Sequence, residues 1–205
     1  MSVAPAAAEA VLDFWLGAAA NEPAAVAAAS KRWFRGGETL DREIAQRFGT
    51  AIEAALDGGL EEWAASPRGR LALVILLDQF TRNVHRGTAR AFAGDARARA
   101  LTEAALESGE DRALTHIERL FLYLPLEHAE EPAAQERSVE AQRRLAAEAP
   151  AELAAYLADC VTHAEEHRDV VARFGRFPHR NTALGRETTP EERTYLEAGA
   201  RRYGQ

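Results

Sequence analysis

The stretch SPRGRLALVILLDQFTRN, residues 66–83, decides the fold of this chain. Its serine and proline form a typical helix start, because a serine oxygen accepts a hydrogen bond from the first free N–H groups and proline has no N–H to lose there. The run over 71–77 is the most apolar in the sequence, and Asp78 interrupts it, as in a buried helix rather than a membrane span. We therefore expect a central, buried helix over residues 66–83.

Outside this segment the apolar residues recur at spacings of three and four, and alanine, leucine, glutamate and arginine dominate. This pattern is typical of helices and predicts no strand. Glycine, proline and capping residues mark the helix ends. The sequence predicts an all-α fold of about nine helices in antiparallel pairs, with further helices over 6–16, 23–34, 40–56, 95–107, 112–124 and 134–148, one that opens at Pro150 and one whose capping motif occupies 188–192.

The composition narrows the function. The 25 basic side chains are outnumbered by 32 acidic ones, for a net charge of −7, which argues against a nucleic-acid or anionic-membrane surface. The single cysteine, Cys160, leaves neither an internal disulfide nor a cysteine-based zinc site and fits a reducing compartment. The start of the chain lacks the features of a signal peptide, and no linker divides residues 1–205. We expect one cytoplasmic domain that binds neither nucleic acid nor membrane.

The stretch RFGRFPHRN, residues 173–181, is the most unusual part of the sequence. Residues 173–186 contain four arginines, one histidine and no acid, in an acidic protein. We expect Gly175 to end the preceding helix with a positive φ, and Phe174 and Phe177 to be buried, so that the segment is ordered without a ligand. Four of its polar residues would then face an internal carboxylate or a ligand, namely Arg176, His179, Arg180 and Asn181.

Other polar residues stand next to apolar segments. Asp78 and Arg82 are four residues apart on one helical face, which predicts either a surface ion pair or a buried functional pair. Asp95 has the position of a simple helix N-cap. Glu127 and His128 follow a proline, in a stretch where we expect a loop. Adjacent carboxylate and imidazole groups can tune each other but rarely face each other in regular structure.

The sequence HAEEH, residues 163–167, formally matches the reversed zinc motif H-x-x-E-H. Its two imidazoles are four residues apart and fall on one helical face. A third ligand cannot be identified, and both histidines border an apolar stripe. The interpretation that we prefer is a hydrogen-bonded histidine at the edge of the core, with no required metal and no cofactor.

Four segments together resemble the bacterial family of unknown function called DUF924. They are VLDFW (11–15), LDQFTRNVHRGTARAFAGD (77–95), FLYLPLEHAEE (121–131) and RFGRFPHRNTALGRETTPEE (173–192). The resemblance implies an all-α fold similar to tetratricopeptide-like helical stacks and implies no established activity. The family pattern usually has a proline where this chain has Thr81.

The resemblance also implies which residues form the family's motif. Carried onto this sequence, the positions are Asp78, Gln79, Arg82, Asn83, Arg86, Phe92, Asp95, Pro125, Glu127, His128, His167, Arg173, Phe174, Gly175, Arg176, Pro178, His179, Arg180, Asn181 and Arg186.

We expect the motif segments to converge on one polar cavity that binds a small carboxylate- or phosphate-bearing molecule. Three arginines would clamp the anion, namely Arg82, Arg176 and Arg180. Either His128 or His167 would transfer a proton, oriented by Asp78 or Glu127. The remaining candidates for ligand binding are Asn83, Arg86, His179, Asn181 and Arg186.

Two alternatives remain open. In the first, the polar motif is a buried structural staple, and the chain is a helical interaction module that binds a protein or peptide partner elsewhere. In the second, the histidines hold a metal ion for catalysis. Substitution separates the staple from the ligand site, because removing a staple residue leaves a buried charge uncompensated.

Overall fold

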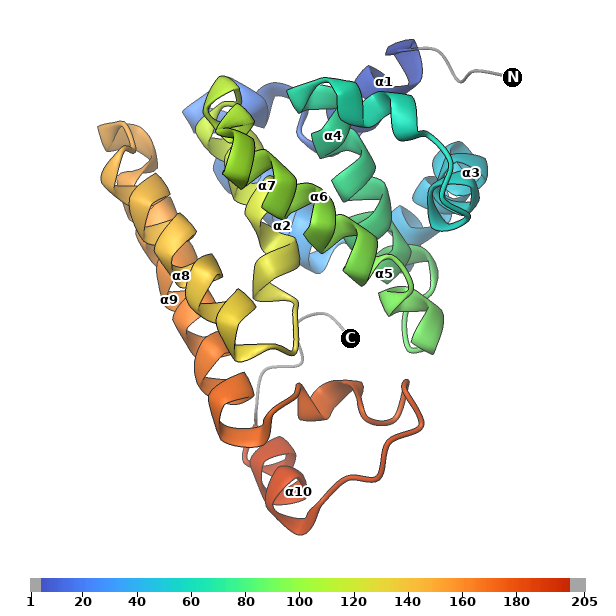
Figure 1. The fold of residues 1–205 in the computed structure, drawn as a ribbon, viewed down its shortest axis with the longest axis vertical. Coiled ribbons are helices and arrows are strands. Elements are labelled where there is room, and N and C mark those ends of the chain that lie inside the picture. Colours follow the sequence, from blue (N-terminus) through green and yellow to red (C-terminus); the bar gives the residue numbers. More distant parts are fainter. Residues whose placement is uncertain (1–4, 200–205) are drawn as a thin grey trace.

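The computed structural model describes residues 5–199, and these form helices and no strand (Figure 1). The predicted all-α fold is confirmed. The α-helices are α1 (Pro5–Trp15), α2 (Pro23–Arg35), α3 (Gly37–Leu56), α4 (Pro67–Val74), α5 (Thr81–Val84), α6 (Asp95–Ser108), α7 (His116–Glu127), α8 (Pro132–Ala147), α9 (Ala151–Phe174) and α10 (Pro190–Glu197). None of them is long and apolar enough to cross a membrane.

The predicted central helix is present and buried. Ser66 caps it by accepting a hydrogen bond from the Gly69 N–H at 3.2 Å, and every residue over 71–81 is buried. Its three parts, α4, a π-helical segment (Ile75–Phe80) and α5, follow one another without a break. This central element contacts α1, α3, α6 and α7, so that it forms the middle of the main core (Figure 1).

Thr81, which stands where the family pattern usually has a proline, closes the π-helical segment. The Thr81 N–H donates to the Leu76 carbonyl, five residues earlier, and the Thr81 hydroxyl donates to the Leu77 carbonyl at 2.6 Å. A proline at this position has no N–H and could not close this turn. The segment carries Asp78, and π-helical turns are frequent at functional sites.

The expected boundaries of α7 are wrong at both ends. The helix begins at His116, where Thr115 and Glu118 form a capping box, and it continues through Pro125 to Glu127. The His128 N–H donates to the Leu124 carbonyl at 2.9 Å and closes a turn beyond the proline. All side chains of the helix from Ile117 to Glu127 are buried, and this packing outweighs the local preference against proline. Glu127 is therefore helical, and His128 is the C-cap rather than a loop residue.

Helices α8 and α9 form a long antiparallel pair that leads to the C-terminal part of the chain (Figure 1). Residues 175–197, which we call the C-terminal strap, begin at Gly175, whose φ of +69° confirms the predicted end of α9. Phe177 is fully buried, as predicted, whereas Phe174 is only half-buried and packs on Tyr195. The capping box of Thr189 and Glu192 opens α10, also as predicted. A regular tetratricopeptide-like repeat stays a prediction.

Candidate functional site

Asp78 lies at the centre of a buried polar cluster. Its Oδ1 is 2.7 Å from His128 Nδ1 and 3.1 Å from Arg82 Nη1, and its Oδ2 accepts a hydrogen bond from the Gln79 amide at 2.5 Å. Burial alone would raise the pKa of this fully buried carboxyl, but Arg82 and His128 outweigh that effect and hold the pKa below its ordinary value. Asp78 is therefore an ionised acceptor.

His128 is oriented by Asp78. Because an ionised carboxylate can only accept, the close contact assigns the ring proton to Nδ1 and leaves the Nε2 lone pair available. Burial, opposed by Asp78 and supported by Arg82, lowers the pKa of the imidazole, so His128 is neutral at neutral pH. Of its side chain, 17% remains exposed.

Asp95 joins two arginines and is not a helix cap. Gly94 occupies the cap position of α6, and no side chain caps that helix, so the expected role as N-cap is wrong. The Asp95 carboxylate instead accepts two hydrogen bonds from Arg82, at 2.9 and 3.0 Å, and one from Arg180 at 3.5 Å. Because the Asp95 carboxylate binds Arg82 of α5 and Arg180 of the strap, it does not bind the free N–H groups at the start of its own helix.

Arg180 is the least well paired of the buried arginines. Its side chain is 7% exposed, and its guanidinium lies 4.7 Å from the Phe92 ring centre and 4.6 Å from the Phe177 ring centre. The long bond to Asp95 is its only hydrogen bond within the described residues, where its buried Nε has no partner. Burial, together with repulsion from Arg82, lowers its pKa to about 10. A guanidinium with several unused donors is a natural anion-binding group.

A second carboxylate and imidazole pair lies beside the first. His167 Nδ1 is 3.2 Å from Glu127 Oε1 and also 2.7 Å from the backbone carbonyl of His163. Burial, with repulsion from Asp78 and Glu166, raises the pKa of Glu127 to about 8, so Glu127 is largely neutral at pH 7. Burial also holds the pKa of His167 well below its ordinary value.

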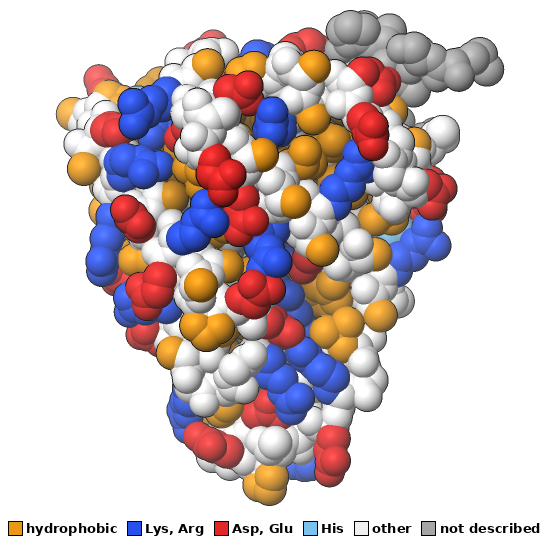
Figure 2. Space-filling view, in the orientation of Figure 1, with side chains coloured by type: hydrophobic (Ala, Val, Ile, Leu, Met, Phe, Trp, Pro, Cys, Tyr) orange, Lys and Arg blue, Asp and Glu red, His pale blue; other side chains and the backbone are white. Residues whose placement is uncertain are grey.

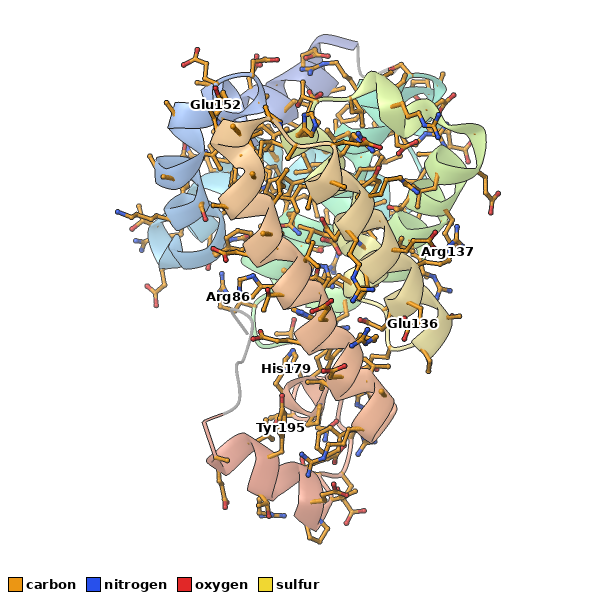
Figure 3. All side chains as sticks on the ribbon, turned by 90° about the vertical axis from the view of Figure 1, so that its left-hand side faces the viewer. Arg86, Glu136, Arg137, Glu152, His179 and Tyr195 are labelled. Atoms are coloured by element: carbon orange, nitrogen blue, oxygen red, sulfur yellow. The ribbon has the colours of Figure 1, made fainter. Side chains whose placement is uncertain are left out.

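The three imidazoles of His128, His167 and His179 lie near one another, close to Phe177 and Arg180 of the strap. The ring centres of His128 and His167 are 6.3 Å apart. The ring centre of Phe177 is 5.5 Å from those of both His167 and His179. Burial and the neighbouring Arg180 lower the pKa of His179 to about 3. Figure 3 shows His179 between the helical body and the end of the chain that carries Tyr195.

Glu130 ties the strap to the helical body. It accepts two hydrogen bonds from Arg186, at 2.6 and 2.9 Å, and one from the Phe177 backbone N–H at 2.7 Å. Although burial opposes the shift, Arg186 and this N–H lower the pKa of Glu130. The position of Phe177 over the imidazoles therefore depends on a carboxylate between α7 and α8.

Within the strap, Arg176 pairs with an acid of the same segment. It donates to both carboxylate oxygens of Glu192, at 2.6 and 2.9 Å, and Asn181 donates to Glu192 at 3.1 Å. These contacts, led by the Arg176 hydrogen bonds, lower the pKa of Glu192 to about 2. Arg176 and Asn181 thus hold the strap's own shape and are not part of the Asp78 cluster.

Asn83 and Arg86 contact another acid, Asp41 on α3. Asn83 donates to Asp41 at 2.7 Å, and Arg86 donates to both of its carboxylate oxygens at 3.1 Å. In Figure 3 Arg86 lies apart from His179, on the body side of the strap. The two residues join α5 and the following loop to α3.

The convergence that the sequence predicts is found for part of the set. Asp78, Arg82, Glu127, His128, His167, His179 and Arg180 come together from α5, the π-helical segment, α7, α9 and the strap, with Asp95 among them. Figure 2 shows acidic and basic side chains interleaved over the lower part of the molecule. Two pockets found elsewhere, about 390 Å³ beside Arg176 and about 130 Å³ beside Arg137, do not contain this cluster, so a cavity at the cluster stays a prediction.

The two histidines of the formal zinc motif, His163 and His167, differ in burial. His167 is buried and its Nδ1 lies against a backbone carbonyl, whereas His163 is exposed. Over residues 5–199 no group of three or more histidine, cysteine, aspartate and glutamate side chains is arranged to hold a metal ion. That the protein needs no metal stays a prediction.

Fold and cluster define an all-α protein whose buried acids, imidazoles and arginines meet where a C-terminal strap joins a helical body. The family model described as bacterial protein of unknown function, DUF924, matches residues 11–200, and the chain belongs to that family. A solved structure of a protein of unknown function from Agrobacterium tumefaciens is 42% identical, covers 95% of this chain and 98% of its own, and superposes with a TM-score of 0.78. The comparison with curated proteins found no match.

Proposed function

We propose that the cluster around Arg180 binds a small carboxylate- or phosphate-bearing molecule and that His128 transfers a proton to or from it. The observation that carries the proposal is the buried, poorly paired guanidinium of Arg180, close to an imidazole whose tautomer Asp78 fixes. Leaving such donors unused inside a protein is costly, and an incoming anion would satisfy them.

The roles of the other residues follow from their contacts. Arg82 is held by Asp78 and Asp95 and supports the charge of the site rather than reaching out to a ligand. His167 is the weaker candidate for proton transfer, for two reasons. The carboxyl beside it, Glu127, is largely neutral, and its own Nδ1 already faces a backbone carbonyl. The proposal therefore favours His128 and Asp78 as the acting pair.

A structural role is favoured for five of the predicted ligand-binding residues. Asp41 engages Asn83 and Arg86, Glu192 engages Arg176 and Asn181, and Glu130 engages Arg186, each at hydrogen-bonding distance. These contacts match the staple alternative. The staple and the ligand site are compatible: these pairs would hold the strap in place, and Arg180 would bind the ligand.

Thermal unfolding with sulfate, phosphate and small mono- and dicarboxylates tests the ligand site. We expect saturable stabilisation of about 5–10 °C at about a hundred times Kd, because a ligand that binds only the folded state adds about 2.7 kcal/mol there. Arg180→Gln should abolish the response, and the matched variant Arg176→Gln, whose side chain pairs inside the strap, should keep it.

The same experiment separates the two roles. If every anion leaves the wild-type melting temperature unchanged, the ligand site is wrong and the cluster is a staple. If Arg176→Gln loses the response as completely as Arg180→Gln, the response does not depend on Arg180 specifically, and the assignment of the anion to the Arg180 and His128 cluster is wrong.

A further inference from the structure

The charges around Arg180 are balanced when the imidazoles and Glu127 are neutral. Within residues 5–199 the cluster around this guanidinium holds three carboxylates and three arginines from five parts of the fold, namely Asp78, Asp95, Glu130, Arg82, Arg180 and Arg186. Glu166 acts on Glu127. An anion that enters a balanced, buried cluster leaves at least one negative charge uncompensated, which is costly in a poorly solvated site.

Three imidazoles are the groups that can restore the balance by taking up a proton. His128, His167 and His179 are all kept neutral by burial and by the positive charge of Arg180. An anion bound to Arg180 cancels that repulsion and adds an attraction of its own. The pKa of the nearest imidazole must then rise.

The contacts select His128 among the three. Its Nδ1 is 2.7 Å from Asp78, an ionised carboxylate that is already in place to stabilise an imidazolium. The carboxyl beside His167 is the largely neutral Glu127, and the carboxylate that acts on His179, Glu130, already accepts two hydrogen bonds from Arg186. A protonated His128 would keep its Nδ1–H on Asp78 and gain an Nε2–H that can donate to the ligand.

We infer that an anion enters this site together with one proton, which His128 holds between Asp78 and the bound ligand. The inference rests on the proposed anion site and adds that His128 is charged in the complex. His128 therefore meets its substrate as a general acid, with a proton ready for a leaving or carbonyl oxygen, and the imidazole that remains afterwards can accept a proton in return.

Linkage then sets the pH dependence of binding. Above the pKa of free His128 and below that of the complex, one proton is taken up per anion, so the affinity falls about tenfold for each unit of rising pH. Below the pKa of the free imidazole, the proton is already present and the affinity no longer depends on it.

Calorimetric titration with sulfate in two amine buffers of different ionisation enthalpy counts this proton. At about pH 7.5 we expect about one proton taken up per sulfate by the wild-type protein. His128→Gln, or His128→Asn if the first variant does not fold, should still bind sulfate with no proton taken up and an affinity that no longer falls as the pH rises. Because the pKa of the free imidazole lies below its ordinary value of 6.5, this uptake requires that sulfate raise the pKa of His128 by about two units or more, which NMR titration measures.

The outcomes separate the two proposals. Sulfate binding with equal heats in both buffers overturns the proton uptake and leaves the anion site intact. A His128→Gln variant that still takes up one proton overturns the assignment to His128. Absence of sulfate binding to the wild-type protein overturns the anion site itself, and the inference falls with it.

Discussion

Replacing Asp95 by alanine should lower the free energy of unfolding by about 3–4 kcal/mol, close to the cost of breaking a buried ion pair. Asp95 is the carboxylate that holds Arg82 in two-point contact and is the acid paired with Arg180. Without it, Arg82 keeps Asp78 as its ion-pair partner, and Arg180 loses the ion pair that it makes within the described residues. Because 24% of the Asp95 side chain is exposed, the cost lies in the lower part of the range for fully buried pairs.

The size of this loss in the free energy of unfolding decides between two roles for Asp95. If Asp95 only complemented the dipole at the start of α6, its removal would cost about 0.3–1 kcal/mol. Urea unfolding of Asp95→Ala measures the difference, and Glu191→Ala is the matched control, since Glu191 lies in the first turn of α10 and pairs with exposed Arg173. A cost below about 1 kcal/mol in both variants would contradict the ion network.

The network also predicts non-additivity. In an Arg180→Gln background one of the two guanidiniums is already gone, so the second substitution at Asp95 should cost less than it does alone. Equal costs in both backgrounds would show that Arg180 and Asp95 do not interact, despite the 3.5 Å between Arg180 Nη1 and Asp95 Oδ2.

Local chemistry predicted the helices well. The cap at Ser66, the end of α9 at Gly175 and the capping box at Thr189 each depend on two to four neighbouring residues, and the structure has all three. The failure at Pro125 has the opposite cause. There the local signal favours a helix end, but burial of both flanking leucines extends the helix to Glu127.

The site was predictable only in its components. Asp78 and Arg82 could be paired from their spacing, because four residues bring side chains together on a helix. Three acids that hold the arginines were missed or misinterpreted: Asp41, Glu130 and Asp95. Asp41 lies 45 residues from its partner Arg86, Glu130 lies 56 from Arg186, and Asp95 lies 13 from Arg82. The periodicity of a helix cannot predict contacts between residues so far apart in the sequence. The excess of arginine over 173–186 was the one available signal that acids must approach from elsewhere.

Glu127→Gln should make the protein progressively more stable than the wild type as the pH rises from about 4.5 to about 8. The folded protein raises the pKa of this carboxyl from 4.5 to about 8, through burial and the nearby charges of Asp78 and Glu166. Glutamine has nearly the shape of the protonated acid and no proton to lose. Each pKa unit corresponds to about 1.4 kcal/mol, so the full difference amounts to several kcal/mol.

The sign follows from proton binding. Between the two pKa values the folded state keeps the Glu127 proton and the unfolded state has released it, so wild-type stability falls as the pH rises. Above about pH 8 both states are ionised and the penalty is constant. Below about pH 4.5 both are protonated, and wild type and variant should differ little.

Chemical unfolding of both proteins at several pH values measures this difference directly. Glu136→Gln, a change at an exposed position of α8 (Figure 3), is the control and should follow the wild type at every pH. An infrared band of a protonated carboxyl at neutral pH, absent from Glu127→Gln, provides a second measurement. If the stability difference is independent of pH and the band is missing, Glu127 is ionised in the folded protein, and the neutral carboxyl beside His167 is wrong.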